Sequence, residues 1–220
     1  MKATLFDQLR RTPEASAAAN AASVLSNLSA DKNLMEHFYL TGYEGLCLGL
    51  SHRELTRSII SSAVPMCGEI LVVGENDEVE FWTAICDELH IAATAVVANG
   101  QDAATAVSDV LKEDTCISSV LCSASYGESA IKALCDAAHK RRCSVIVDNA
   151  SSRVDLAKIE DLGIDFAIST AETEQPVSII IAKRSRLVMT EGNARQGAHD
   201  IYAVWQDSLS CRNPKWVPMA

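Results

Sequence analysis

The sequence predicts an α/β protein built in three layers, with a seven-stranded, mostly parallel sheet and helices on both of its faces. Short runs of β-branched and apolar residues recur along the chain, and amphipathic helical patterns fill most of the gaps between them. Strands that alternate with helices pair in parallel through right-handed crossovers, so helices cover both faces of the sheet. The chain has 220 residues, 48% of them hydrophobic and 22% charged, which is enough for one large core.

The part of the chain ahead of the sheet is expected to be helical. It contains TPEASAAANAASVLSNLSADKNLMEHFYLTG, which is rich in alanine at first and amphipathic further on. We therefore assign residues 1–42 to an N-terminal helical segment and residues 43–220 to the domain that contains the sheet.

Seven segments have the length and composition of strands. They are 46–50, 69–74, 92–98, 117–122, 143–149, 166–170 and 177–182. The last gap, AETEQP at 171–176, is too short for a helix. The seventh strand is therefore expected to run antiparallel to the sixth.

Three of the intervening or closing segments show clear helical periodicity. The segments at 78–90 and 102–113 each place apolar residues on one helix face, and 194–210 is expected to close the fold. The predicted core-facing residues are Val79, Trp82, Ile85, Cys86 and Leu89 in the first helix, and Ala104, Val107, Val110 and Leu111 in the second.

Charge and hydropathy exclude two classes of partner. The net charge is −10, and the short basic cluster HKRR at 139–142 does not offset it, so a nucleic-acid partner is not expected. No apolar run approaches the ~20 residues that span a bilayer, and the N-terminus lacks the apolar stretch of a signal peptide. We expect no membrane association and a cytoplasmic location.

The eight cysteines contain no CxxC pair and are expected to be thiols rather than disulfides. Cys135, His139 and Cys143 are spaced i, i+4, i+8 and would share one face of a helix, which raises the possibility of zinc. Core-facing positions explain two of these residues better, and no fourth ligand is evident. No metal is therefore expected.

The turns after the strands contain neither GxGxxG nor GxxxxGK[ST], so a dinucleotide or P-loop site has no motif behind it. Asp148 is the most informative residue at these strand ends, because it directly follows the apolar run Val145–Val147. A carboxylate there is costly to desolvate unless it meets a cation or hydrogen-bond donors. A helix N-cap or a simple salt bridge would also explain it.

Two segments resemble a known family. CSVIVDNASSRVDLAKIEDLGIDFAIST (143–170) holds a strand, an aspartate, paired serines, a short helix and a second strand, and AHDIYAVWQDSLSCRNPKWVP (198–218) holds a helix followed by a KW turn. From residue 43 to 218, about four-fifths of the chain, the sequence resembles the large domain of class V, fold-type I pyridoxal-phosphate aminotransferases, in particular the 2-aminoethylphosphonate:pyruvate transaminases.

The resemblance implies roles for individual residues. The family's aspartate, which keeps the pyridine nitrogen of the cofactor protonated, falls on Asp148. The lysine that binds the cofactor as a Schiff base falls on Thr173, which has no amine, and the next lysine is Lys183. The resemblance therefore implies no catalytic residue and no covalently bound cofactor, although pyridoxal phosphate held noncovalently remains possible.

The rest of the implied site is also altered. The glycine-rich phosphate cup becomes Leu50–Arg53, in which Ser51 is kept and two glycines are replaced by Leu50 and His52. Arg53 is expected to be a surface residue. The ring-stacking aromatic falls on or near Asp77, and Ser123 is kept after the fourth strand. The resemblance thus assigns a vestigial cofactor-binding set of Asp148, Ser51, Ser123 and Ser151.

These changes predict a degenerate aminotransferase-like protein that acts as a binding or regulatory module without transaminase activity. The alternative is a pyridoxal-phosphate-dependent transaminase, or a cofactor-binding subunit, of 2-aminoethylphosphonate or amino-acid metabolism. A third possibility is a thiol-dependent activity of Cys122, for which a core thiol is the simpler interpretation.

The resemblance also implies assembly. Family members place the active site at a twofold interface, and the small domain that follows the KW turn is expected to be absent because the chain ends at Ala220. An apolar face on the last helix then predicts a homodimer, unless this helix packs on its own sheet. Its residues are Ile201, Tyr202, Val204, Trp205 and Leu209. A small molecule or another protein is a further possible partner.

Overall fold

The computed structural model describes residues 42–98, 102–150, 154–171 and 177–212. The predicted N-terminal helical segment, except Gly42, lies outside the described residues, and so do Ser151 and Thr173. The predictions that concern them stay predictions.

The sheet has seven strands in the order β1-β7-β6-β5-β4-β2-β3. β7 runs antiparallel to both of its neighbours, and all other pairs are parallel. The antiparallel pairing of β7 with β6 confirms the prediction from the short gap between them. The strands are β1 (Tyr43–Leu48), β2 (Glu69–Gly74), β3 (Ala93–Val97), β4 (Ile117–Ser123), β5 (Ser144–Asp148), β6 (Phe166–Ala171) and β7 (Val177–Lys183).

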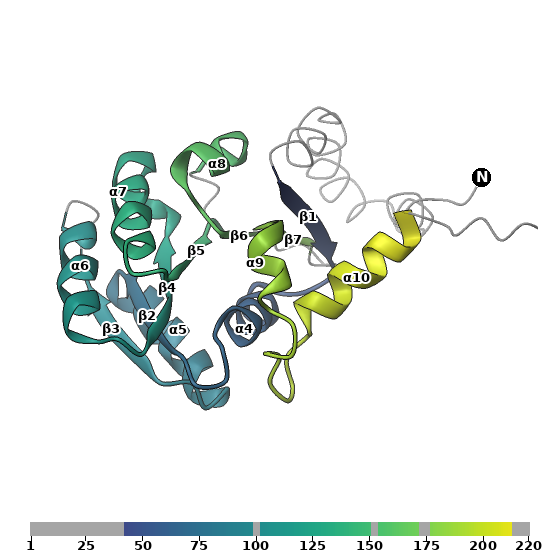
Figure 1. The fold of residues 1–220 in the computed structure, drawn as a ribbon, viewed down its shortest axis with the longest axis horizontal. Coiled ribbons are helices and arrows are strands. Elements are labelled where there is room, and N and C mark those ends of the chain that lie inside the picture. The colour runs from purple at the N-terminus through teal and green to yellow at the C-terminus, as the bar shows by residue number, and fades with distance from the viewer. Residues whose placement is uncertain (1–41, 99–101, 151–153, 172–176, 213–220) are drawn as a thin grey trace, which may run out of the picture.

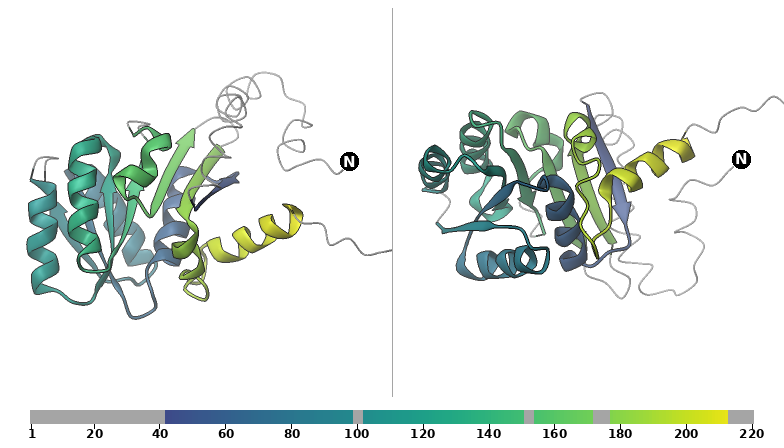
Figure 2. Two further views of the ribbon diagram at one scale, coloured as in Figure 1. Left: turned by 45° about the horizontal axis from the view of Figure 1, so that its top comes forward. Right: turned by 60° about the horizontal axis from the view of Figure 1, so that its bottom comes forward.

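Helices cover both faces of this sheet, so the predicted three-layer α/β fold is confirmed (Figure 1, Figure 2). α6, α7 and α8 lie on one face, and α4, α5, α9 and α10 lie on the other. The helices are α4 (His52–Ala63), α5 (Asn76–Glu88), α6 (Ala103–Glu113), α7 (Glu128–His139), α8 (Ile159–Leu162), α9 (Arg184–Val188) and α10 (Ile201–Arg212), with short 3₁₀ turns η1 (Ala124–Tyr126) and η2 (Leu156–Lys158).

The core is divided by the sheet into two apolar clusters. In β5, Val145 and Val147 join the cluster under α6, α7 and α8, whereas Ile146 joins the cluster under α4 and α5. Successive side chains of a strand point to opposite faces, so a strand that is covered on both sides must be apolar throughout. This requirement explains why the sequence shows unbroken apolar runs instead of alternation.

The helix faces predicted from periodicity are confirmed. The five residues predicted for the first helix are all buried, four of them in α5 and the fifth, Leu89, directly after it. On α6, Val107 and Leu111 are buried while Ala104 and Val110 are partly buried. β1 begins three residues earlier than predicted. Tyr43 explains the difference, because its ring is buried and its hydroxyl donates a hydrogen bond to the carbonyl of Ile164 at 2.8 Å.

α10 packs on its own domain, which removes two of the residues used to predict a homodimer interface. Ile201 is fully buried and Trp205 is only 6% exposed, and both join the cluster beneath α4 and α5. Tyr202 lies edge-on to Trp205 with ring centroids 5.8 Å apart. The side chain of Leu209 is outside the described residues.

None of the helices in the described part of the chain combines the length and apolar character needed to cross a bilayer.

Candidate functional site

Asp148 ends β5 and is the centre of the candidate site. It lies at the carboxyl edge of the parallel strands, where open α/β sheets bind their ligands. Its side chain is 7% exposed. Oδ2 lies 2.8 Å from Nε2 of His52 and accepts a 3.3 Å hydrogen bond from Nε1 of Trp82, while Oδ1 accepts one from the backbone N–H of Ala150 at 3.1 Å. Hydrogen-bond donors thus compensate the burial of this carboxylate.

A pocket of about 280 Å³ opens beside Asp148. It lies between the starts of α4 and α5 and the ends of β4 and β5. Its lining is His52, Asp77, Glu78, Phe81, Trp82, Ser123, Asp148 and Ala150. The structure therefore brings together Asp148, Ser123 and Asp77 from the sequence prediction.

The start of α5 forms one wall of this pocket. Glu78 accepts a hydrogen bond from the backbone N–H of Glu75 at 3.0 Å on Oε2, and from the hydroxyl of Ser123 at 2.5 Å on Oε1. Glu78 thus caps its own helix and links it to the end of β4. Asp77 is exposed beside it and forms no hydrogen bond or ion pair with any other described residue.

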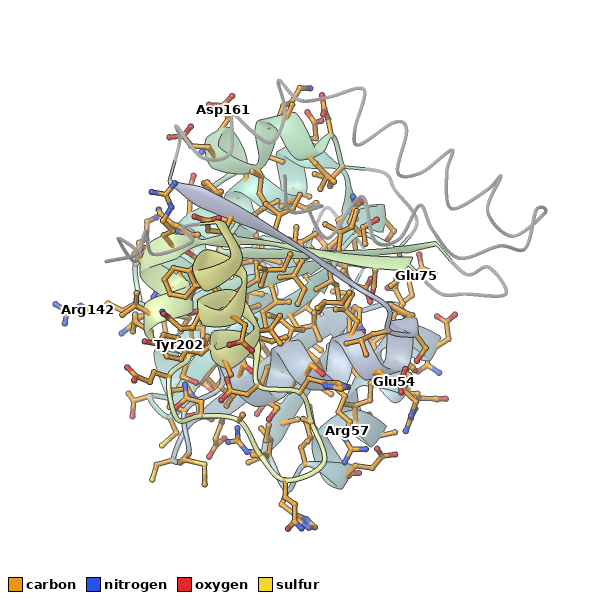
Figure 3. All side chains as sticks on the ribbon, turned by 90° about the vertical axis from the view of Figure 1, so that its right-hand side faces the viewer. Glu54, Arg57, Glu75, Arg142, Asp161 and Tyr202 are labelled. Carbon is orange, nitrogen blue, oxygen red and sulfur yellow. The ribbon has the colours of Figure 1, made fainter. Side chains whose placement is uncertain are left out.

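The start of α4 is capped in the same way, although Ser51 and Glu54 themselves are not among the residues that line the pocket. Ser51 is the N-cap, and its backbone N–H and hydroxyl both donate to Oε2 of Glu54, at 3.0 and 2.7 Å. These hydrogen bonds hold the pKa of Glu54 below its usual value. Figure 3 shows Glu54 and Glu75 on one side of the molecule and Arg142, just before β5, on the opposite side.

Gly74, the last residue of β2, allows α5 to approach the sheet. A Cβ at this position would lie 2.8 Å from Cζ3 of Trp82 and 3.0 Å from Oε2 of Glu78. Both distances are shorter than ordinary van der Waals contact, so a side chain here would displace the pocket wall.

His52 is the residue whose role the sequence analysis missed, since it was considered only as a replaced glycine. Its ring stacks on Phe81 with centroids 5.2 Å apart and planes inclined by 12°. Arg53 turns outward, forms an ion pair with Glu88 and lies 5.8 Å from the Phe81 centroid. Arg53 is therefore a surface residue, as predicted.

Helical spacing could have identified the aromatic residues of the pocket. Phe81 follows Asp77 by four residues, and Trp82 follows Glu78 by four, so each pair lies on one side of α5. Helical periodicity placed Trp82 correctly in the core, but it gave no sign that the indole N–H of Trp82 reaches Asp148.

Of the two predictions about cysteines, the structure contradicts one and favours the other. The helix-face spacing of Cys135, His139 and Cys143 is wrong, because α7 ends at His139 and Cys143 lies after a turn, immediately before β5. His139 contacts Asp165 at 2.8 Å. Cys122 is fully buried, and desolvation raises the pKa of its thiol well above the usual range, which favours a core thiol.

The described part of the pocket is a poor match for pyridoxal phosphate. Three carboxylates line it, those of Asp77, Glu78 and Asp148, and neither lysine nor arginine is among its lining residues. The donors at Ser51, where the resemblance places the phosphate cup, are already bonded to Glu54. An anionic cofactor would meet like charge at both places.

Lys183, the next lysine after Thr173, lies away from the candidate site. It pairs with Tyr43 at the start of β1, and its backbone N–H bonds the carbonyl of Asp165, just before β6. Because these residues mark the amino edge of the parallel strands, Lys183 lies at the edge of the sheet opposite Asp148.

Comparison with known proteins relates the chain to aminotransferases in sequence. No protein-family model matches the chain. A 2-aminoethylphosphonate–pyruvate transaminase of Bacillus cytotoxicus is 30% identical over 173 residues, which cover 72% of this chain and 46% of that protein. The chain thus spans about half the length of this curated relative.

Solved structures share the fold at low sequence identity. A ureidoglycine–glyoxylate aminotransferase of Bacillus subtilis matches with a TM-score of 0.64 and 12% identity, covering 96% of this chain and 57% of its own. A pyridoxamine–pyruvate aminotransferase of Mesorhizobium loti matches with a TM-score of 0.62 and 15% identity, covering 96% and 56%. The chain therefore has the large-domain fold of class V, fold-type I pyridoxal-phosphate aminotransferases and resembles a 2-aminoethylphosphonate–pyruvate transaminase in sequence.

Proposed function

We propose that this chain is a binding module with an aminotransferase fold, that it does not form a covalent bond to pyridoxal phosphate, and that it does not catalyse transamination. The observation that carries this proposal is the contact between His52 and Asp148 beneath Phe81. In the family that the chain resembles, the aspartate serves the ring nitrogen of the cofactor and an aromatic residue stacks on the ring.

In this chain, the protein's own imidazole makes both of those contacts. His52 places a ring nitrogen 2.8 Å from Asp148 and a flat face against Phe81. Trp82 already donates to the same carboxylate oxygen, and the other oxygen accepts the Ala150 N–H. A pyridine ring would have to displace His52 to reach Asp148.

Charge supports the proposal independently. A phosphate about 5 Å from one carboxylate is opposed by roughly 3 kcal/mol per pair of unit charges at an effective dielectric constant of ~20. Asp77 and Glu78 both line the pocket, and Glu54 holds the donors of Ser51. At Thr173, the position implied for the lysine, the side chain has no amine that could bond to the cofactor.

The second candidate function is a pyridoxal-phosphate-dependent transaminase, or a cofactor-binding subunit, acting on 2-aminoethylphosphonate or an amino acid. The 30% sequence identity to a 2-aminoethylphosphonate–pyruvate transaminase favours this second candidate. On this alternative, His52 would swing away from Asp148 when the cofactor enters.

The two candidates differ in the visible spectrum. The purified protein is titrated with pyridoxal phosphate, scanned for the absorption of the bound cofactor, treated with borohydride and digested for mass spectrometry. We expect no new visible band and no lysine peptide that carries the reduced cofactor. A yellow protein with the cofactor fixed to one defined lysine would refute the proposal and establish the second candidate.

We also propose a cytoplasmic location and retain the homodimer as a prediction of the resemblance alone. The burial of Ile201 and Trp205 within the domain leaves the dimer without the surface argument that first supported it. Sedimentation at micromolar concentration decides it, since a monomer has a mass of 23.6 kDa.

A further inference from the structure

We propose that the pocket beside Asp148 binds a small organic cation, such as a primary alkylammonium ion. This inference rests on the proposed function, because it requires that the site takes no pyridoxal phosphate. Three observations lead to this proposal. The residues that line the pocket carry negative charge, the backbone N–H groups at the nearby helix starts are already bonded to glutamates, and the cavity has aromatic walls and room for a small molecule.

The lining of the pocket carries an excess of negative charge. Asp77, Glu78 and Asp148 contribute three carboxylates, and His52 is the only basic side chain among the lining residues. His52 is already placed against Asp148. The remaining two carboxylates belong to successive residues in the first turn of α5, and Asp77 has no hydrogen-bond or ion-pair partner among the described residues.

Helix starts would ordinarily favour an anion, because their free N–H groups and the helix dipole attract negative charge. Here α4 and α5 both begin with a capping box. Glu54 accepts the backbone N–H of Ser51, and Glu78 accepts that of Glu75, each at 3.0 Å. The protein's own carboxylates therefore occupy donors that an external anion would need, and they leave negative charge at the mouth of the pocket.

The cavity is large enough only for a small ligand. Its volume of about 280 Å³ lies just below the range of roughly 300–1,000 Å³ for ligand pockets. Phe81 and Trp82 form apolar walls, and Trp82 is held in place by its hydrogen bond to Asp148. Aromatic walls combined with carboxylates suit an organic ammonium ion, which has both an alkyl part and a charge.

An inorganic metal ion fits less well. Across the described ranges, no three histidine, cysteine, aspartate or glutamate side chains are arranged to hold a metal ion. Glu78 is further committed to Ser123 and to the N–H of Glu75. The carboxylates thus surround a space instead of converging on one point.

The test uses three ligands of the same length and different charge. Putrescine, 1,4-butanediol and succinate are titrated into the full chain by calorimetry, while the indole N–H resonance of Trp82 is followed by NMR. We expect putrescine to bind with a Kd below 1 mM and to shift the Trp82 resonance, and we expect the diol and the dianion to do neither. Raising the salt concentration should weaken putrescine binding, because the attraction is partly screened.

Asp77→Asn should raise the Kd for putrescine at least tenfold, because it removes one exposed carboxylate of the pocket without changing the shape of the side chain. Asp161→Asn is the matched control and should leave the Kd unchanged. Asp161 is an exposed aspartate on α8, which packs on the face of the sheet opposite α5, and Figure 3 shows it well apart from Glu75 at the start of α5. Absence of putrescine binding, or equal Kd values for Asp77→Asn and the control, would overturn the cation site. Neither result would restore pyridoxal phosphate binding, so the proposed function is tested separately by its own spectrum.

Discussion

Replacing His52 with alanine removes the imidazole that links the start of α4 to the end of β5. The hydrogen bond to Asp148 is worth about 1.5–3 kcal/mol, as bonds to charged groups are, and the stack on Phe81 contributes about 0.5–1.5 kcal/mol. The loss should be smaller than the sum of these two contributions, because Asp148 keeps two other donors in the variant. The side chain of His52 is also 22% exposed, so water can replace part of its hydrogen bond to Asp148. We expect His52→Ala to lower the free energy of unfolding by about 2 kcal/mol.

Urea denaturation followed by circular dichroism measures this change. With a slope of about 2 kcal/mol per molar urea, the midpoint should fall by roughly 1 M. His199→Ala is the control, since that side chain is exposed, and it should change stability by less than about 0.5 kcal/mol. Free imidazole should raise the midpoint of His52→Ala but not of the unsubstituted protein, because only the variant offers a vacated position beside Asp148.

The partnership itself is tested by a double-mutant cycle with Asp148→Asn. Residues in direct contact couple by about 0.5–3 kcal/mol, whereas independent sites are additive. Additive effects of the two substitutions, or a His52→Ala midpoint equal to that of the control, would refute the claim that His52 and Asp148 form the centre of the site.

Four further predictions concern the rest of the domain. Gly74→Ala should displace α5 by forcing a Cβ to 2.8 Å from Trp82, and should quench or shift tryptophan fluorescence with a stability loss of about 1–3 kcal/mol; unchanged fluorescence and stability would contradict the close approach. Trp205→Glu should destabilise the domain by more than about 3 kcal/mol in thermal melts, since it buries a carboxylate, whereas a folded monomer of unchanged stability would place Trp205 at an interface. Exposed Cys67 should react with a thiol reagent at pH 8 while buried Cys86, whose pKa burial raises from 9.0 to about 12, should react only on unfolding, as peptide mass spectrometry can show. Because the unfolded chain ionises that thiol first, stability should fall as the pH rises from 9 toward 12, and the fall should be smaller in Cys86→Ala.

The sequence was sufficient for the fold because the fold depends on local patterns that repeat. Apolar strands buried on both faces and helices with one apolar face can be packed in few ways, and the gap before β7, too short for a helix, indicated its antiparallel direction. The position of Asp148 at a strand end was also readable, because an acid that follows three apolar strand residues has to be compensated by donors.

The sequence alone could not identify what compensates Asp148. His52 is 96 residues away in the chain and Trp82 is 66 away, and no periodicity links a helix start to the end of a distant strand. Likewise, the apolar residues of α10 are compatible with an interface or with a core, and only the packing of Ile201 and Trp205 under α4 decides between them. Local sequence therefore determined which elements form and which of their faces are apolar, whereas tertiary structure decided which side chains meet, because such contacts depend on where the sheet brings separate segments together.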